Sequence, residues 1–357
     1  MPGSPSLTFP EQLEAKRLLT AALADGPAHA YLFHGPPGVG KRLAAREFAA
    51  EIIGEPERVL RGAHPDVYQV AALGEMIRID AIRELRRDLH MRPFEAERRV
   101  YLIFDADELN EDAADALLKD LEEPPPYAVI VLVADDLGPI AETVRSRCQL
   151  VPFRRLSERA IRAQVDARAG ARAEAERIAL ARVAAGRLDR LERLLDERSV
   201  ARRTALLEVA RGVYADPAFE PGEAASRIVT AARERGVEAR EREEAAVEGL
   251  DLPARDADQR VRRAARGAER EELLDALEAL SAWYRDLVAV AVGADGVVVH
   301  ADRLDELRAD ASRERLAGAT EAAEAARETW RQLEEFNLTP SLAFEALFVK
   351  LQRGLAV

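Results

Sequence analysis

The sequence predicts an α/β domain built on a parallel sheet, followed by helices that continue through the rest of the chain. Two observations predict this fold class: short apolar runs alternate with helix-like segments up to Arg154, and the strand signal stops there. The later residues are rich in Ala, Leu, Arg and Glu, which favour helices. A chain of 357 residues is long enough for several domains. We expect three, at residues 1–155, 156–198 and 199–357.

Five apolar runs in the first part are expected to form the sheet. They are residues 30–34, 67–70, 99–104, 129–133 and 149–153. Helix-like segments accompany them, at residues 11–24, 42–53 and 110–123. The last of these helices should stop at Pro124, Pro125 and Pro126, because proline interrupts helical hydrogen bonding. Since parallel strands need crossover connections, we expect helices to cover both faces of the sheet.

The second part of the chain is expected to be helical throughout. Residues 157–195 indicate two or three helices, interrupted at Gly170 and Gly186. Residues 233–270 are dense in mixed charge, which is typical of a solvated helix or a partly mobile connection. Farther on, apolar side chains recur every three or four positions and predict a buried helix face. These side chains are Leu273, Leu277, Leu280, Tyr284 and Leu287.

A glycine-rich loop follows the first predicted strand and opens a helix. It satisfies Gly-x4-Gly-Lys, and its residues are Gly35, Pro36, Pro37, Gly38, Val39, Gly40 and Lys41. In such loops the glycines let backbone N–H groups close around phosphates, and the lysine adds a positive charge. The strand before it and the helix after it are the context that this mechanism requires. The loop therefore predicts a phosphate-binding fold, with retention as a plain strand-to-helix connector as the alternative.

Two parts that nucleotide hydrolysis requires are missing together. Arg42 stands where the motif requires a Ser or Thr hydroxyl, and a guanidinium cannot ligate Mg²⁺. Asp105 directly follows the strand at 99–104, at the position where a second metal contact belongs. Ala106 stands where hydrolytic relatives carry the glutamate that polarises the attacking water. The sequence thus predicts that this chain does not hydrolyse ATP. It leaves open whether ATP or ADP binds, and Mg²⁺ is expected only with a bound nucleotide.

Composition limits the classes of function. The net charge of −13 disfavours strong, independent nucleic-acid binding, which depends on neutralising phosphates. Cys148 is the single cysteine, so the chain can form neither an internal disulfide nor a cysteine-based zinc site. We expect Cys148 to be a small buried apolar residue rather than a reactive thiol. No stretch of about twenty apolar residues occurs, so we expect a cytoplasmic protein without a membrane partner.

Several motifs together resemble the AAA+ subunits of bacterial clamp loaders. The two most specific are Leu-Glu-Glu-Pro-Pro at residues 121–125 and Ser146-Arg147-Cys148. Further similar segments extend across the chain, at residues 29–33, 64–66, 79–83, 281–287 and 337–345. The resemblance implies an AAA+ P-loop domain, a small helical lid domain and an all-α C-terminal collar domain. Within the family, the chain resembles the delta-prime type more than the ATP-hydrolysing gamma/tau type, because residues that hydrolysis requires are missing.

The resemblance also implies roles for individual residues. Arg147 matches the family's arginine finger, which acts in trans on the ATP of a neighbouring subunit. Arg190 matches loosely the lid-domain arginine that senses nucleotide, and a solvated helix arginine is the alternative. Trp283 and Tyr284 are either anchors of a collar interface or core residues of their own domain. Alone, an arginine such as Arg147 in a charged chain would be read as solvated surface.

The implied partners are the gamma/tau and delta subunits of DNA polymerase III, the sliding clamp, and primed DNA reached through the complex. Many relatives carry a four-cysteine zinc module after the first helix of the P-loop domain. Residues 54–58 hold no cysteine here, so we expect no zinc and assign no metal ligand. Two other functions stay open: a stand-alone or gamma/tau-like ATPase that tolerates Arg42, and a binding module that uses neither nucleotide nor Arg147.

Overall fold

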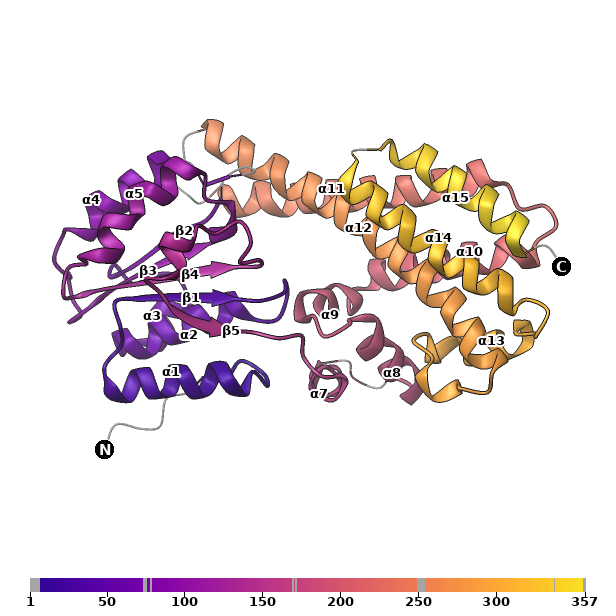
Figure 1. Ribbon diagram of the computed structural model, residues 1–357, viewed down its shortest axis with the longest axis horizontal. Coiled ribbons are helices and arrows are strands. Elements are labelled where there is room, and N and C mark those ends of the chain that lie inside the picture. The colour runs from indigo at the N-terminus through magenta and orange to yellow at the C-terminus, as the bar shows by residue number, and fades with distance from the viewer. Residues whose placement is uncertain are drawn as a thin grey trace. The chain divides into compact units, whose positions relative to one another are not determined.

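The computed structural model describes residues 7–72, 76–77, 79–168, 170, 172–248, 254–336 and 338–355, and it groups the chain into two compact units (Figure 1). The first unit comprises Met1–Ala160 together with Gly186–Asp189, and the second comprises Ile161–Ala185 together with Arg190–Val357. The predicted boundaries of three domains stay a prediction.

The first unit contains the expected parallel sheet. Its five strands are β1 (Ala30–His34), β2 (Val67–Val70), β3 (Arg99–Phe104), β4 (Ala128–Ala134) and β5 (Gln149–Pro152). They lie in the order β2-β3-β4-β1-β5, and each neighbouring pair is parallel. Every residue of β3 and β4 is buried, as expected for strands covered on both sides. The predicted α/β fold class is therefore confirmed.

Helices cover both faces of this sheet (Figure 1). The helices of the unit are α1 (Leu13–Asp25), α2 (Lys41–Ile53), α3 (Pro56–Leu60), α4 (Ile79–Leu89), α5 (Glu111–Glu122) and α6 (Glu142–Arg145). Successive strand residues point to opposite faces. Thus Tyr31 and Phe33 contact Phe48 of α2, whereas Leu32 joins the core that α4 and α5 complete on the other face.

The parallel topology determines where the loops gather. β1 lies between β4 and β5, and β4 lies between β1 and β3. In a parallel sheet the carboxyl ends of all strands meet at one edge, which is where such folds bind ligands. The segments that follow β1, β3 and β4 therefore lie side by side. These segments begin with Gly35, Asp105 and Asp135.

The second unit is helical, as predicted. It contains most of α7 (Glu158–Arg168), then α8 (Glu174–Val183), the last five residues of α9 (Leu188–Leu194), and α10 (Glu197–Ala215), α11 (Pro221–Val247), α12 (Ala254–Ala291), α13 (Leu304–Asp310), α14 (Leu316–Glu335) and α15 (Pro340–Leu355). Among the described helices of the whole chain, none combines the length and apolar character that crossing a bilayer needs.

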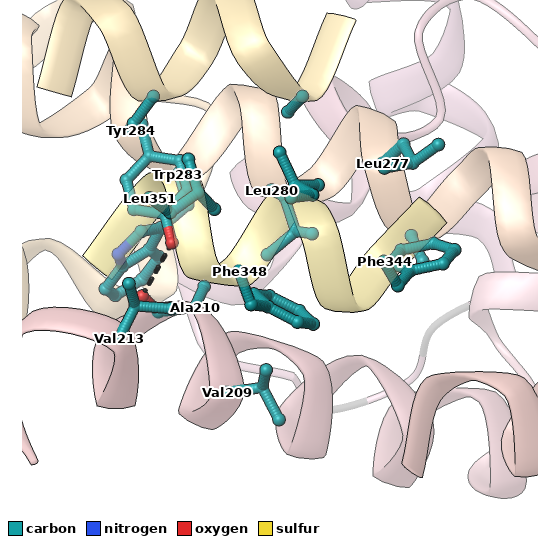
Figure 2. Packing of buried hydrophobic residues seen from close by; sticks show 14 of the residues in the cluster. Val209, Ala210, Val213, Leu277, Leu280, Trp283, Tyr284, Phe344, Phe348 and Leu351 are labelled. Atoms are coloured by element: carbon teal, nitrogen blue, oxygen red, sulfur yellow. Dashed lines mark hydrogen bonds between the residues drawn. The ribbon is translucent and has the colours of Figure 1, made fainter. Parts of the chain in front are cut away.

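The core of the second unit is organised by α12. All five residues of its predicted apolar face are buried. Trp283 and Tyr284 are also in this core rather than at the surface, so the alternative of exposed interface anchors is wrong. Trp283 donates a hydrogen bond to the Tyr214 hydroxyl (3.2 Å), and Tyr284 donates to the Ala210 carbonyl (3.0 Å). Figure 2 shows these side chains beside Phe348 of α15 and α10 residues.

The charge-rich stretch at 233–270 is helical wherever it is described. It forms the end of α11 and the start of α12, which pack along each other, while residues 249–253 lie outside the described part. Gly236 permits this close approach, because a Cβ there would be 3.1 Å from the carbonyl oxygen of Ala265. Of the two predicted alternatives, the solvated helix is correct for the described residues, because most of their side chains are exposed or half-buried.

Cys148 follows α6 in the sequence and packs against the core that α4 and α5 cover. Burial raises the pKa of its thiol to about 12. Since the thiolate is the nucleophile, this environment suppresses reactivity at neutral pH. Cys148 is half-buried rather than fully buried, and its low reactivity stays a prediction.

The Leu280→Ala variant tests the α12 core. Leu280 is fully buried, so we expect a loss of about 2–5 kcal/mol in the free energy of unfolding of this unit. Urea denaturation should be followed by tryptophan fluorescence, because both tryptophans, Trp283 and Trp330, belong to this unit. Leu342→Ala is the matched control, since Leu342 is 64% exposed on α15. Equal effects of the two variants would contradict this core.

Cys148 should be nearly inert to thiol reagents in the folded protein. With a pKa of about 12, roughly one thiol in ten thousand is ionised at pH 8. We expect alkylation with iodoacetamide to be on the order of 10³-fold slower than for an exposed cysteine. Mass spectrometry of time points, with urea-unfolded protein as the control, measures the rate. Rapid labelling of the folded chain would contradict the raised pKa of this thiol.

Candidate nucleotide site

The glycine loop has the backbone that its sequence predicts. It connects β1 to α2, which begins at Lys41. Gly38 and Gly40 adopt positive φ angles of 72° and 96°, a conformation that favours glycine. Gly35 must also lack a side chain, because a Cβ there would be 2.1 Å from the carbonyl oxygen of Phe153. The loop therefore retains the shape of a phosphate cradle at a helix N-terminus.

Lys41 contacts the loop and a carboxylate of the same chain. Its side chain is 4% exposed, and Nζ donates to the Gly35 and Pro36 carbonyls, the latter at 2.6 Å. Nζ also forms an ion pair with Asp135 at 2.7 Å. Burial lowers the pKa of Lys41, while the charge of Asp135 acts in the opposite direction. The charge that the motif offers to a phosphate is thus matched by Asp135.

Arg42 and Asp105 form an ion pair, with the guanidinium also 5.0 Å from the ring centroid of Phe104. Asp105 is held in the left-handed region at φ 57°. In a hydrolytic site the positions of these two residues would both hold Mg²⁺. Here a fixed positive charge occupies one position and binds the carboxylate at the other. These residues therefore do not fit a magnesium ion.

Ala106 supplies no group that could activate water. It begins a 3₁₀ turn, Ala106–Glu108, and is 1% exposed. The next residue, Asp107, accepts hydrogen bonds from the backbone N–H groups of Asp135 and Asp136, both at 3.2 Å. Asp107 therefore holds the end of β4 beside the end of β3. Its role is to organise the backbone on which Asp135 stands.

A segment distant in sequence lies on the glycine loop. The Leu188 N–H donates to the Gly38 carbonyl at 2.7 Å, and the Asp189 carboxylate packs against Gly38. A Cβ on Gly38 would be only 1.7 Å from Asp189 Oδ1. Arg187 forms an ion pair with Asp189 at 2.6 Å, which orients the carboxylate. The sequence singled out Arg190, but the residue that lies against the glycine loop is its neighbour Asp189.

Arg190 has carboxylate partners in its own unit. It is 5% exposed and forms ion pairs with Glu278 and, at 3.4 Å, with Asp275, both on α12. It is therefore not a solvated helix arginine. Its expected contact with nucleotide stays a prediction.

Arg147 is exposed by about one third and pairs with Glu122. Its guanidinium also donates to the Thr143 carbonyl at 2.7 Å. Glu122 is the last residue of α5 and belongs to the Leu-Glu-Glu-Pro-Pro motif. The two most specific sequence motifs therefore meet in one ion pair. That proximity could not be read from residues 25 positions apart.

Sequence reasoning missed Asp135 and Asp189. Asp135 had a usable signal, because it follows a buried strand of a predicted parallel sheet directly. Asp189 had none, since one acidic residue in a helix rich in charge is unremarkable. Of the predicted residues, the loop from Gly35 to Lys41 lies with Arg42 and Asp105 at this edge. The functional roles of all these residues stay predictions.

Comparison with known proteins supports the resemblance for the N-terminal part of the chain. Residues 11–157 match the family described as DNA polymerase III, delta subunit. The chain is 34% identical over 158 residues to DNA polymerase III subunit delta' of Bacillus subtilis (strain 168), covering 41% of this chain and 48% of that protein. It is 35% identical over 136 residues to the delta' subunit of Pseudomonas aeruginosa, covering 34% and 42%.

The tau subunit of DNA polymerase III from Bacillus subtilis is similar to the same degree. It is 34% identical over 159 residues, covering 41% of this chain and 28% of that protein. The chain thus spans half or less of the length of the curated relatives that it matches. Among solved structures, a gamma subunit-related protein of Thermotoga maritima aligns at 18% identity and a TM-score of 0.42, covering 96% and 99% of the two chains.

The comparisons therefore agree with the motifs on which the resemblance was based. The matched residues contain the glycine loop, the sheet and the Ser-Arg-Cys motif. Over this part, the chain is related to the delta' and tau/gamma subunits of DNA polymerase III, which confirms its resemblance to the bacterial clamp-loader AAA+ family.

Proposed function

We propose that this chain is a delta-prime-like subunit of the bacterial replicative clamp loader. It joins gamma/tau and delta subunits, helps to place the sliding clamp on primed DNA, and supplies Arg147 to the ATP site of a neighbouring subunit. It does not hydrolyse ATP itself. The chain is then a component of DNA polymerase III without a nucleotidyltransferase activity of its own.

The observation that carries this proposal is the ion pair between Arg42 and Asp105. Phosphoryl transfer depends on a metal ion that bridges the phosphates and neutralises the charge that develops. A guanidinium offers only donors and repels a cation, so it cannot share Asp105 with Mg²⁺. Because Ala106 also lacks a carboxylate, metal binding and water activation are both lost.

The position of Arg147 supports a role in trans. A guanidinium keeps its charge at any physiological pH and can bind two phosphate oxygens at once. Its pair with Glu122 is partly exposed, and exposed pairs contribute about 0–1 kcal/mol. Arg147 can therefore exchange Glu122 for a γ-phosphate at little cost. The charge spread over the transferring group is what an arginine finger stabilises.

The second unit is proposed to provide the collar. In the family, helices at this end of the chain pack against the equivalent helices of other subunits. Trp283 and Tyr284 do not form that surface here, because both are buried in the core of the unit. Contacts with partners would instead use side chains outside this core.

The isolated chain should not turn over ATP. We expect phosphate release with Mg²⁺ and ATP to stay at background, and Lys41→Ala to leave it unchanged. A coupled phosphate-release assay on purified full-length protein measures both. Brisk release that Lys41→Ala abolishes would instead favour a self-sufficient ATPase.

Arg147→Ala should impair the complex rather than the chain. In a complex reconstituted with gamma/tau and delta subunits, we expect the ATP site facing Arg147 to lose about 10³-fold in rate. DNA-stimulated ATPase of the complex should fall by the contribution of that site. Arg145→Ala is the control, because Arg145 is equally exposed on the same turn and pairs with Glu142. Normal turnover in an intact Arg147→Ala complex would refute the finger.

A further inference from the structure

The glycine loop is surrounded by carboxylates of its own chain. Asp135 pairs with Lys41, Asp105 pairs with Arg42, and Asp189 packs against Gly38 while it pairs with Arg187. These carboxylates come from the ends of β3 and β4 and from α9. The sheet topology brings the first two together, and the Leu188–Gly38 hydrogen bond fixes the third.

Asp135 and Asp189 each contact a residue that nucleotide binding would require. Lys41 is the residue that reaches phosphates in loops of this kind. Here it is buried, and its Nζ is surrounded by Asp135 and by the carbonyl oxygens of Gly35 and Pro36. Gly38 belongs to the backbone that would curve around a phosphate, and Asp189 lies against it. A phosphate entering this loop would therefore meet like charge and an engaged lysine.

We propose that Asp135 and Asp189 close the glycine loop to nucleotide phosphates, so that the chain itself supplies the anions for this site. The inference rests on the proposed function and adds a property that it does not require, because a non-hydrolysing subunit could still bind ADP. The two carboxylates act on different parts of the loop. Asp135 neutralises Lys41, and Asp189 places negative charge directly on the loop.

The arrangement also explains why Gly38 must be glycine on two grounds. Its positive φ of 72° disfavours a side chain, and the Asp189 carboxylate fills the space where a Cβ would stand. The loop and α9 are therefore matched to each other. Removing only the charge of Asp189 keeps this packing, since asparagine has nearly the same shape.

The test is ADP binding by the full-length chain without metal, measured by isothermal titration calorimetry. We expect undetectable binding for the natural sequence. Asp189→Asn and Asp135→Asn should each raise affinity about tenfold or more, and the double variant should bind ADP in the micromolar range. Inorganic phosphate, titrated separately, should show the same order of affinities. Circular dichroism and thermal unfolding verify that each variant is folded.

Glu192→Gln is the matched control, because Glu192 is an exposed carboxylate of α9 that pairs with Arg168. It should leave ADP binding undetectable. Micromolar binding of ADP by the natural sequence would overturn the inference. So would a folded double variant that still fails to bind ADP. Neither result would touch the absence of hydrolysis. ATP turnover by the isolated chain would defeat both the proposed function and this inference, because turnover requires a bound nucleotide, whereas ADP binding without turnover would defeat the inference alone.

Discussion

The structure depends on the parallel alignment of β3, β4 and β1. Because these strands run in the same direction, their carboxyl ends deliver Asp105, Asp135 and Gly35 to one edge of the sheet. The ion pairs of Lys41 with Asp135 and of Arg42 with Asp105 follow from that placement. Lys41 reaches Asp135 because β1 and β4 are neighbours, and Asp107 holds the two chain ends of β3 and β4 together. A fold built for ligand binding therefore brings its charges together whether or not a ligand is used.

At this edge the charges pair with one another. Hydrolytic sites keep a lysine for phosphate and a carboxylate for metal, with neither neutralised by the protein. Here Arg42 alters that balance, because one added positive charge gives Asp105 a partner within the chain. Lys41 and Asp135 form a second pair in the same loop region. The glycine loop therefore keeps the backbone of a phosphate-binding loop, while its charged side chains form ion pairs with carboxylates of the same chain.

The sequence was sufficient for the elements and insufficient for the pairings. All five strands were predicted within one residue of their bounds, because buried strands are short apolar runs. The α12 face was predicted from its period, and the helix N-cap at Asn110 agrees with the predicted start of α5. The roles of Trp283 and Tyr284 stayed open because an apolar period does not say whether a buried face is internal or shared.

Charged side chains were harder, since their partners depend on tertiary placement. Arg190 was chosen by resemblance, yet its carboxylate partners are 85 and 88 positions away on α12. Asp189, one residue earlier, lies on the loop instead. One position along a helix turns a side chain by about 100°, so adjacent residues face different surroundings. No periodic pattern in a segment rich in arginine and acid distinguishes the two.

The ion pair between Glu122 and Arg147 covers part of the guanidinium with a carboxylate. Until a stronger anion arrives, the guanidinium is partly neutralised and held by the Thr143 carbonyl. Stray polyanions therefore meet a weaker attraction than a bare arginine would present. If Arg147 acts as proposed, a γ-phosphate, which carries more charge than a carboxylate, would displace Glu122, and the Glu122–Arg147 pair would then disfavour anions of lower charge.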